Sequence, residues 1–112
     1  MYCKEIELDK PRMFRYDFNA VADIEEKADM NIAELLKPER FGHHTIRLIV
    51  WGGLRWNNKG LTIDAAGKMI NKFMENGGDV EEVYMQIQDM LVKAGILKIV
   101  EDTEGNLEAE TD

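Results

Sequence analysis

Apolar and polar positions alternate through the first part of the chain. In residues 4–8 an isoleucine and a leucine alternate with two glutamates, which is the period of a half-buried strand. An Asp-Lys-Pro sequence at residues 9–11 supplies turn chemistry, and a second extended run with two aromatic residues follows it. The pattern predicts a β-hairpin over residues 4–16.

The rest of the chain changes to helical spacing. Apolar residues recur at intervals of three and four over residues 18–28, 45–56, 62–76 and 79–94. The first of these stripes consists of Phe18, Val21, Ile24 and Ala28. A short helical turn is also expected before Pro38. These elements predict an α+β fold, mainly α, with a single domain over residues 1–100.

Polar residues at the helix starts support these boundaries. Asp17 or Asn19 can cap the first helix, and Thr62 can cap the third. Asp79 precedes Glu82 by three residues, which is the spacing of a capping box. The end of the last helix is left open: Gly95 can stop it, which would leave residues 96–100 as a loose apolar arm or a short strand.

The segment from Ile46 to Ile63 has more apolar surface than one helix face needs. Helical spacing assigns a core stripe to Ile49, Val50, Gly53 and Leu54. This leaves Leu48, Trp51 and Trp56 on other faces, where they are either buried centrally or held by a partner. Two adjacent glycines inside a helix destabilise it by up to about 2 kcal/mol relative to alanine, so close packing or a break must account for Gly52 and Gly53.

Composition and charge restrict the classes of function. The chain has 112 residues and a net charge of −8, and residues 101–112 carry six of its 22 acidic residues and none of its 14 basic ones. A charge of −2 remains for residues 1–100, since 16 acidic residues face 14 basic ones there. We expect residues 101–112 to form a disordered acidic tail. One cysteine, Cys3, and no evident secretory signal favour a cytoplasmic protein.

Catalytic and metal-binding motifs are not found in the sequence. His43 and His44 are adjacent, so on a helix they point about 100° apart and do not form an i, i+4 metal pair. No phosphate-binding loop, nucleophile elbow or zinc protease motif occurs. We therefore expect no enzymatic activity, no catalytic or metal site and no cofactor.

Nucleic-acid binding is the alternative that the sequence leaves open. Arg47, Trp51 and Arg55 follow one helix ridge at intervals of four, where they could stack a base or cover the indole. The helices over residues 62–94 could also form a small DNA-binding regulator of prophage origin. The second of them begins with acidic residues 79–82, which would repel the phosphate backbone.

Two further features favour contact with another protein. Seven methionines occur, and flexible thioether side chains suit surfaces that accept varied apolar partners. Met85 and Val92 lie seven residues apart and away from the main stripe of the last helix. The predicted partner-binding residues are Leu48, Trp51, Arg55, Trp56, Met85 and Val92.

The order of these motifs resembles the tail assembly chaperones of tailed phages and prophages, including those of the gene transfer agent type. The resemblance is carried by RYDFNAVADIEEK, NIAELL, RLIVWGGLRW, LTIDAAGKMI and EEVYMQIQDML. The matching positions are Phe18 with Glu25 and Glu26, then Trp51, Gly53 and Leu54, then Leu61 and Thr62. It extends over nearly all of residues 4–95.

This resemblance implies a non-enzymatic role in the cytoplasm of a bacterial host. A tail assembly chaperone binds the long, largely helical tape-measure protein, keeps it soluble and helps tail-tube subunits gather on it. The resemblance implies the tape-measure protein as partner, with the tail-tube protein and a second copy of the chain, in a homo-oligomer, as further candidates. The resemblance further implies that a translational frameshift can extend the C-terminal region.

Overall fold

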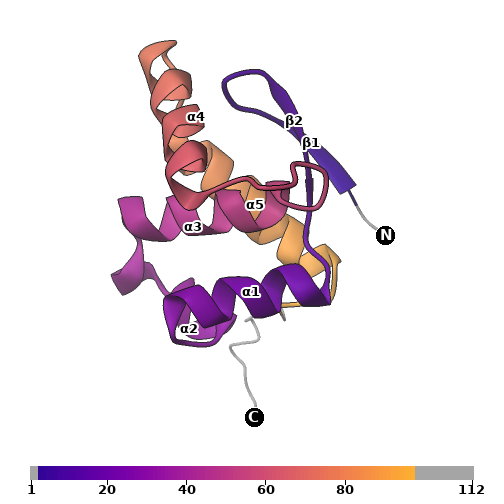
Figure 1. The fold of residues 1–112 in the computed structure, drawn as a ribbon. Helices are drawn as coiled ribbons and strands as arrows, with labels where there is room; N and C mark the ends of the chain where they lie inside the picture. The colour runs from indigo at the N-terminus through magenta and orange to yellow at the C-terminus, as the bar shows by residue number, and fades with distance from the viewer. Residues whose placement is uncertain (1–2, 98–112) are drawn as a thin grey trace.

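The computed structural model describes residues 3–97 as a two-stranded hairpin followed by helices packed around one central helix. Strands β1 (Cys3–Glu7) and β2 (Pro11–Arg15) lead into α1 (Phe18–Ala28), α2 (Ile32–Leu35) and a 3-10 turn, η1 (Pro38–Arg40). Helices α3 (His43–Leu54), α4 (Ile63–Glu75) and α5 (Val80–Lys93) follow. In Figure 1, α3 lies across the middle of the molecule, with α1 below it and α4 and the hairpin above it. The predicted α+β, mainly helical fold is confirmed.

The hairpin buries one face, as its alternating pattern predicts. Its strands are antiparallel, and Lys4 is paired with Phe14. Ile6, Leu8, Phe14 and Tyr16 are buried, while the intervening residues are exposed or half-buried. The Tyr16 hydroxyl donates a hydrogen bond of 2.5 Å to the carbonyl oxygen of Ile49 in α3. The hairpin is therefore fixed to the central helix by both packing and a polar contact.

Helix α1 begins at an N-cap supplied by Asp17, whose carboxylate accepts a hydrogen bond from the backbone N–H of Ala20. Val21 and Ile24 are buried as predicted. The prediction that Phe18 belongs to the buried stripe is wrong, because its side chain is 82% exposed. Phe18 is the first residue of the helix, and Ala20 takes a buried place instead. Four residues of α2 form the short turn expected before Pro38.

Helix α3 is surrounded by the rest of the fold. It begins two residues earlier than predicted, at His43, and ends at Leu54. Helices α1 and α4 and strand β2 pack against it, and every residue from Leu48 to Leu54 is buried. The predicted core stripe of Ile49, Val50, Gly53 and Leu54 is confirmed.

Close packing accounts for the two glycines of α3. A Cβ atom at Gly53 would lie 2.6 Å from the Tyr16 ring and 2.8 Å from the Phe14 ring. A Cβ atom at Gly52 would overlap the side chain of Ile24. The glycines thus let the hairpin and α1 approach the backbone of α3 more closely than any other residue would allow.

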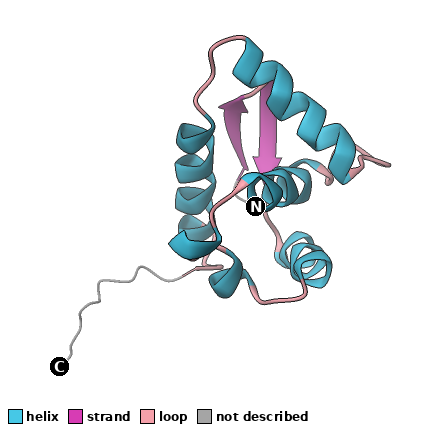
Figure 2. Ribbon diagram, turned by 90° about the vertical axis from the view of Figure 1, so that its left-hand side faces the viewer, coloured by secondary structure: helices cyan, strands magenta, loops and turns pink. Residues whose placement is uncertain are grey.

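Helices α4 and α5 diverge from the loop that joins them. Figure 2, seen from the left-hand side of Figure 1, shows the two helices spreading apart with the hairpin between them. Thr62 caps α4 through Ala65, as predicted. Asp79 caps α5, but its carboxylate accepts from the N–H of Glu81 and not from that of Glu82. The predicted start of the helix is correct, but the predicted capping box is wrong, because Asp79 accepts from the N–H of Glu81 in place of that of Glu82.

Helix α5 ends where the sequence suggested, at Gly95. Gly95 follows the helix with a positive φ of 80°, and the N–H of Ile96 donates to the carbonyl of Leu91. The helix therefore ends at Gly95, the termination that the sequence suggested. Residues 98–100 of the predicted apolar arm and the predicted acidic tail, residues 101–112, lie outside the described residues. Within residues 3–97 no helix is long and apolar enough to cross a bilayer.

Candidate functional site

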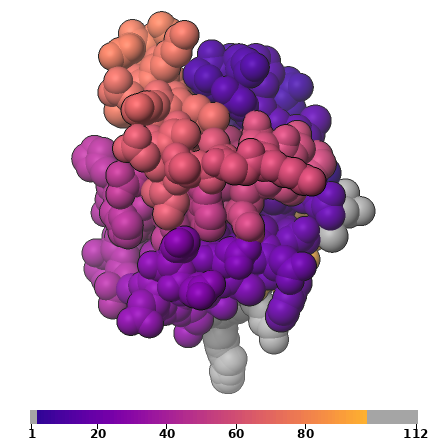
Figure 3. All heavy atoms as spheres, viewed as in Figure 1, coloured from indigo at the N-terminus to yellow at the C-terminus, as the bar shows by residue number. Residues whose placement is uncertain are grey.

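Two of the predicted partner-binding residues are part of the core. Leu48 is fully buried, and Trp51 is only 8% exposed. The indole N–H of Trp51 donates a hydrogen bond of 2.9 Å to the carbonyl of Leu61, in the linker between α3 and α4. Figure 3 shows this linker lying across the front of the molecule, over α3. The prediction of a partner contact at Leu48 and Trp51 is therefore wrong, because the linker and the other helices cover the faces that periodicity left free.

The predicted arginine and tryptophan ridge is also closed to a nucleic-acid base. The Arg55 guanidinium lies 5.1 Å from the centre of the Trp51 ring and forms an ion pair with Asp23. Arg47 lies in the first half of α3, and its side chain packs against Gly67 of α4. Stacking of a base on Trp51 would require the buried indole to leave its site, so the base-stacking interpretation of this ridge is wrong.

Trp56 connects the end of α3 to the hairpin. Its indole N–H donates a hydrogen bond of 3.1 Å to the carbonyl of Met13, and the Arg15 guanidinium lies 5.2 Å from its ring. Trp56 and Arg55 border a depression of about 290 Å³ whose other walls come from residues 15–20. The half-buried Trp56 remains accessible there, but charged and polar neighbours dominate this depression.

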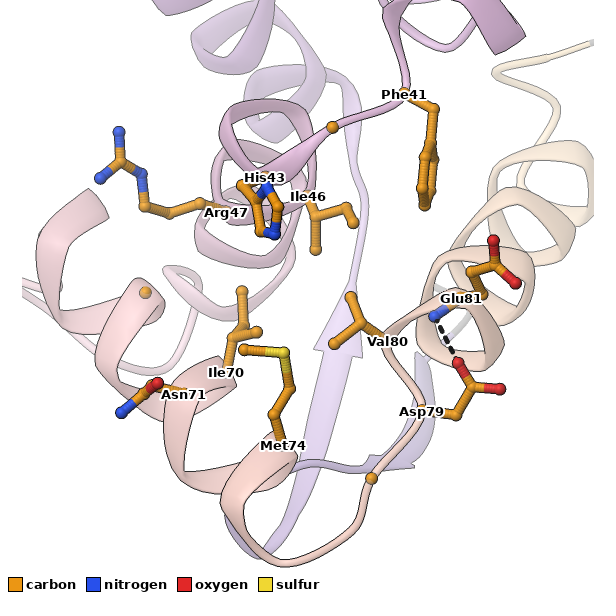
Figure 4. A pocket seen from close by; sticks show the side chains of 13 residues that line it. Phe41, His43, Ile46, Arg47, Ile70, Asn71, Met74, Asp79, Val80 and Glu81 are labelled. Atoms are coloured by element: carbon orange, nitrogen blue, oxygen red, sulfur yellow. Dashed lines mark hydrogen bonds between the residues drawn. The ribbon is translucent and has the colours of Figure 1, made fainter.

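An apolar groove lies between the start of α3, the C-terminal part of α4 and the start of α5. We use the name apolar groove for the cavity of about 400 Å³ bordered chiefly by Phe41, Ile46, Ile70, Met74 and Val80. Figure 4 shows Ile46, Ile70, Met74 and Val80 gathered toward its centre, with Phe41 at one side. These side chains come from the two diverging helices and from α3, so the groove occupies the angle that opens between α4 and α5.

The groove exists because the chain turns sharply at two places. Gly77 has a positive φ of 87°, which favours glycine, and the N–H of Gly78 donates to the carbonyl of Phe73. These contacts end α4 and direct the chain into α5 through Asp79. At the other side, Gly42 precedes α3 without a side-chain cap. The turns leave Met74 42% exposed and Phe41 39% exposed.

A second depression adjoins the groove. We call it the Met85 depression: it has a volume of about 340 Å³ and is bordered by Leu36, Pro38, Phe41, Glu81, Tyr84, Met85 and Gln88. Phe41 and Glu81 border both cavities. The ring of Phe41 stands edge-on to Tyr84, with ring centres 4.8 Å apart. The Tyr84 hydroxyl donates to the carbonyl of Leu36, and burial raises its pKa, so it remains a neutral donor at physiological pH.

Met85 is the predicted contact residue that this surface includes. Its side chain is 67% exposed, as its position off the main stripe of α5 indicates. Val92 is half-buried on the same helix and borders neither cavity. Arg55 and Trp56 border the depression of about 290 Å³ near the hairpin, which shares no bordering residue with the apolar groove or the Met85 depression. The six predicted contact residues therefore do not form one site.

The sequence pattern did not identify the groove. Ile70 and Val80 belong to the core stripes of their helices, and periodicity alone does not show that the two stripes diverge. Met74 lies four residues after Ile70, on the same face of α4, and Phe41 is an aromatic residue in a loop between Pro38 and Gly42. An aromatic residue within a loop is the signal that indicates Phe41. A position off the main stripe indicates Met85 and Val92, and of these two only Met85 borders one of the two cavities.

Charged or polar side chains border the groove on both sides. Asp79 and Glu81 lie on the α5 side, and Arg47 and Asn71 lie on the opposite side (Figure 4). The Nε atom of Arg47 is buried without a hydrogen-bond partner, and its Nη2 lies 3.3 Å from Nδ1 of His44. Within residues 3–97 no group of three or more metal-ligating side chains occurs. The arrangement is suited to hold an apolar segment between two oppositely charged edges.

Comparison with known proteins adds no relative from which a function could be transferred. The features that bear on function are therefore the exposed apolar residues, the two cavities and the charges around them. A comparison with models of protein families finds no match, and comparisons with curated proteins and with solved structures find none either.

Proposed function

We propose that this protein is a non-enzymatic tail assembly chaperone that binds the tape-measure protein of a phage or prophage in the host cytoplasm. The single observation that carries the proposal is the apolar groove, together with the adjoining Met85 depression. A groove of this size suits the apolar side chains of a helix from another protein. The order of motifs along the chain, which resembles this class of chaperone, supplies the identity of the client.

The chemistry of the surface suits a chaperone that releases its client. Met74, Met85 and Phe41 are exposed, and methionine side chains adapt to apolar partners of different shape. Their neighbours are polar or charged residues such as Gln88 and Glu81. An apolar centre with a polar edge gives binding without exposing a large apolar patch when the client is absent.

Co-expression with the tape-measure protein from the same locus tests the proposal. We expect the wild-type chain to raise the soluble yield of the tape-measure protein and to purify with it. Met74→Gln and Met85→Gln should each weaken the complex by about 5- to 30-fold, because burial of a methionine side chain contributes roughly 1–2 kcal/mol. Both variants should keep the wild-type circular dichroism spectrum and melting temperature.

Met13→Gln is the matched control. Met13 is 40% exposed, close to the 42% of Met74, but it lies in the hairpin and borders neither the apolar groove nor the Met85 depression. Its replacement should leave the complex unchanged. A tape-measure protein that is equally insoluble with and without this chain would refute the proposed function.

A further inference from the structure

We propose that the apolar groove binds an amphipathic helix that carries basic residues along one flank of its apolar face and acidic residues along the other. This inference rests on the proposed function, since it specifies which part of a client the chaperone recognises. It adds the charge pattern of the client and a defined orientation in the groove, neither of which follows from chaperone activity.

The shape of the groove favours a helix over an extended strand. The hairpin strands are paired with each other, and the edges of the groove are formed by helices and loops. No strand borders the groove within the described part of the chain, so an extended peptide would find no sheet edge to join. A helix needs no backbone partner, because its own hydrogen bonds are internal.

The two edges of the groove have opposite charge. Asp79 and Glu81 form the acidic edge at the start of α5, and Arg47 forms the basic edge on α3 (Figure 4). The ion pairs found in residues 3–97 include none of these three side chains. Glu81 is exposed, while the Asp79 carboxylate also caps α5 and the Arg47 guanidinium contacts His44; none of the three charges is neutralised by an ion pair within that range. The apolar side chains of Ile46, Ile70 and Val80 lie between the two edges.

A helix in this groove presents its flanking residues to both edges. Its apolar face would lie on Ile46, Ile70 and Val80, much as the central seam of a coiled coil packs between charged flanking positions. Basic residues on the flank facing Glu81 and acidic residues on the flank facing Arg47 would then pair with both. Turning the helix end for end exchanges the flanks, so the charges also determine its direction in the groove.

Two synthetic helical peptides of identical composition test this inference. Both carry the same stripe of leucines; one has its lysines on one flank and its glutamates on the other, and the second has them mixed on both flanks. Because the peptides have equal net charge, their general attraction to the acidic chain is the same. We expect the segregated peptide to bind about three- to tenfold tighter by fluorescence anisotropy, with a smaller preference in 0.5 M salt, a test concentration chosen to shorten the Debye length to a few ångströms.

Neighbouring glutamates supply the matched variants. Glu81 and Glu82 both occupy the first turn of α5 and are exposed, but only Glu81 borders the groove. Glu81→Lys should therefore abolish the preference for the segregated peptide, whereas Glu82→Lys should retain it. Both variants change the charge near the helix start equally, so a difference between them reports the groove and not the stability of α5.

The outcomes separate this inference from the proposed function. Equal affinity for the two peptides, or binding of neither, overturns the inference, even if the tape-measure protein still purifies with the chain. Self-association that both peptides displace and that Met74→Gln weakens would identify a second copy as the occupant and would also overturn it. A client that never purifies with the wild-type chain overturns the proposed function, whichever peptide binds.

Discussion

Replacement of Gly53 by alanine tests the close contact between the hairpin and the central helix. Inside a helix, a change from glycine to alanine ordinarily stabilises a protein by about 0.5–1 kcal/mol. In α3 the added Cβ atom would lie 2.6 Å from Cζ and Oη of Tyr16 and 2.8 Å from Cδ2 of Phe14. Both rings are buried, so neither has free space into which it can move. We expect Gly53→Ala to destabilise the fold.

The expected loss in the free energy of unfolding has two causes, overpacking of the rings and loss of the Tyr16 hydrogen bond. Overpacking of a filled core destabilises by about 1–3 kcal/mol. Displacement of Tyr16 would also break its hydrogen bond to Ile49, and a buried hydroxyl without a partner destabilises by a further 1–3 kcal/mol or so. After the gain of about 0.5–1 kcal/mol in helix propensity, a net loss of roughly 1–5 kcal/mol remains. In a domain of this size each kcal/mol lowers the melting temperature by about 4–8 °C.

Urea unfolding followed by circular dichroism measures this loss, and Gly67→Ala is the matched control. Gly67 also lies inside a helix, but a Cβ atom there would meet only the flexible side chain of Arg47, at 3.0 Å. Gly67→Ala should leave the free energy of unfolding unchanged or raise it by up to about 1 kcal/mol. If Gly53→Ala stabilises the protein as much as Gly67→Ala does, the packing argument for Gly53 is refuted.

Three further predictions follow from buried or charged side chains. Tyr16→Phe should lower the free energy of unfolding by about 0.5–1.5 kcal/mol at neutral pH, because it removes the hydrogen bond to Ile49. Burial raises the folded-state pKa of Tyr16 well above 10.0, so above pH 10.0 the unfolded state ionises first, and the wild type should lose stability more steeply than the variant in alkaline urea titrations. Hydrogen bonding from Arg12 lowers the pKa of Asp9 below 3.8, so its contribution to stability is present above that value and is lost as pH falls through the folded-state pKa. Asp9→Asn should therefore reduce stability more at neutral pH than in acid titrations carried below pH 3.8, and a loss that does not change with pH would contradict this. Trp51→Ala should destabilise the fold by about 3–5 kcal/mol, and a stable variant that has lost only client binding would show that Trp51 faces outward.

Local patterns predicted the elements well. Strand alternation identified the buried Ile6 and Leu8, and cap chemistry placed the helix starts at Asp17 and Thr62. These features depend on residues close in the sequence, so they can be recognised without the tertiary structure. Phe18 shows the limit of this reasoning, because the apolar first residue of a helix can face solvent even when it fits the periodicity.

Burial of the central helix required information from distant parts of the chain. Periodicity correctly assigned Ile49 and Leu54 to the core, but it could not show that the linker at Leu61 covers Trp51. The sequence indicated that Gly52 and Gly53 need close packing or a helix break. It did not indicate that the packing partners lie in α1 and the hairpin. Contacts between different elements of the fold, and not the periodicity of one helix, decide which apolar residues remain for a partner.

The candidate site was less predictable for the same reason. Met85 could be selected because it lies off the stripe of its own helix. The apolar groove depends on the angle between α4 and α5, which no local pattern specifies. Ile70 and Val80 have the same spacing whether they meet in a closed core or border an open groove.

The most direct test of the central claim is to locate the client on the surface of the chaperone. Nuclear magnetic resonance of the isotope-labelled chain, titrated with soluble fragments of the tape-measure protein, measures which backbone amide signals change. We predict that the largest changes occur at Ile70, Met74, Val80 and Met85, around the apolar groove and the Met85 depression. Changes confined to Met13 and Trp56 on the hairpin side, or no changes with any fragment, would contradict the account.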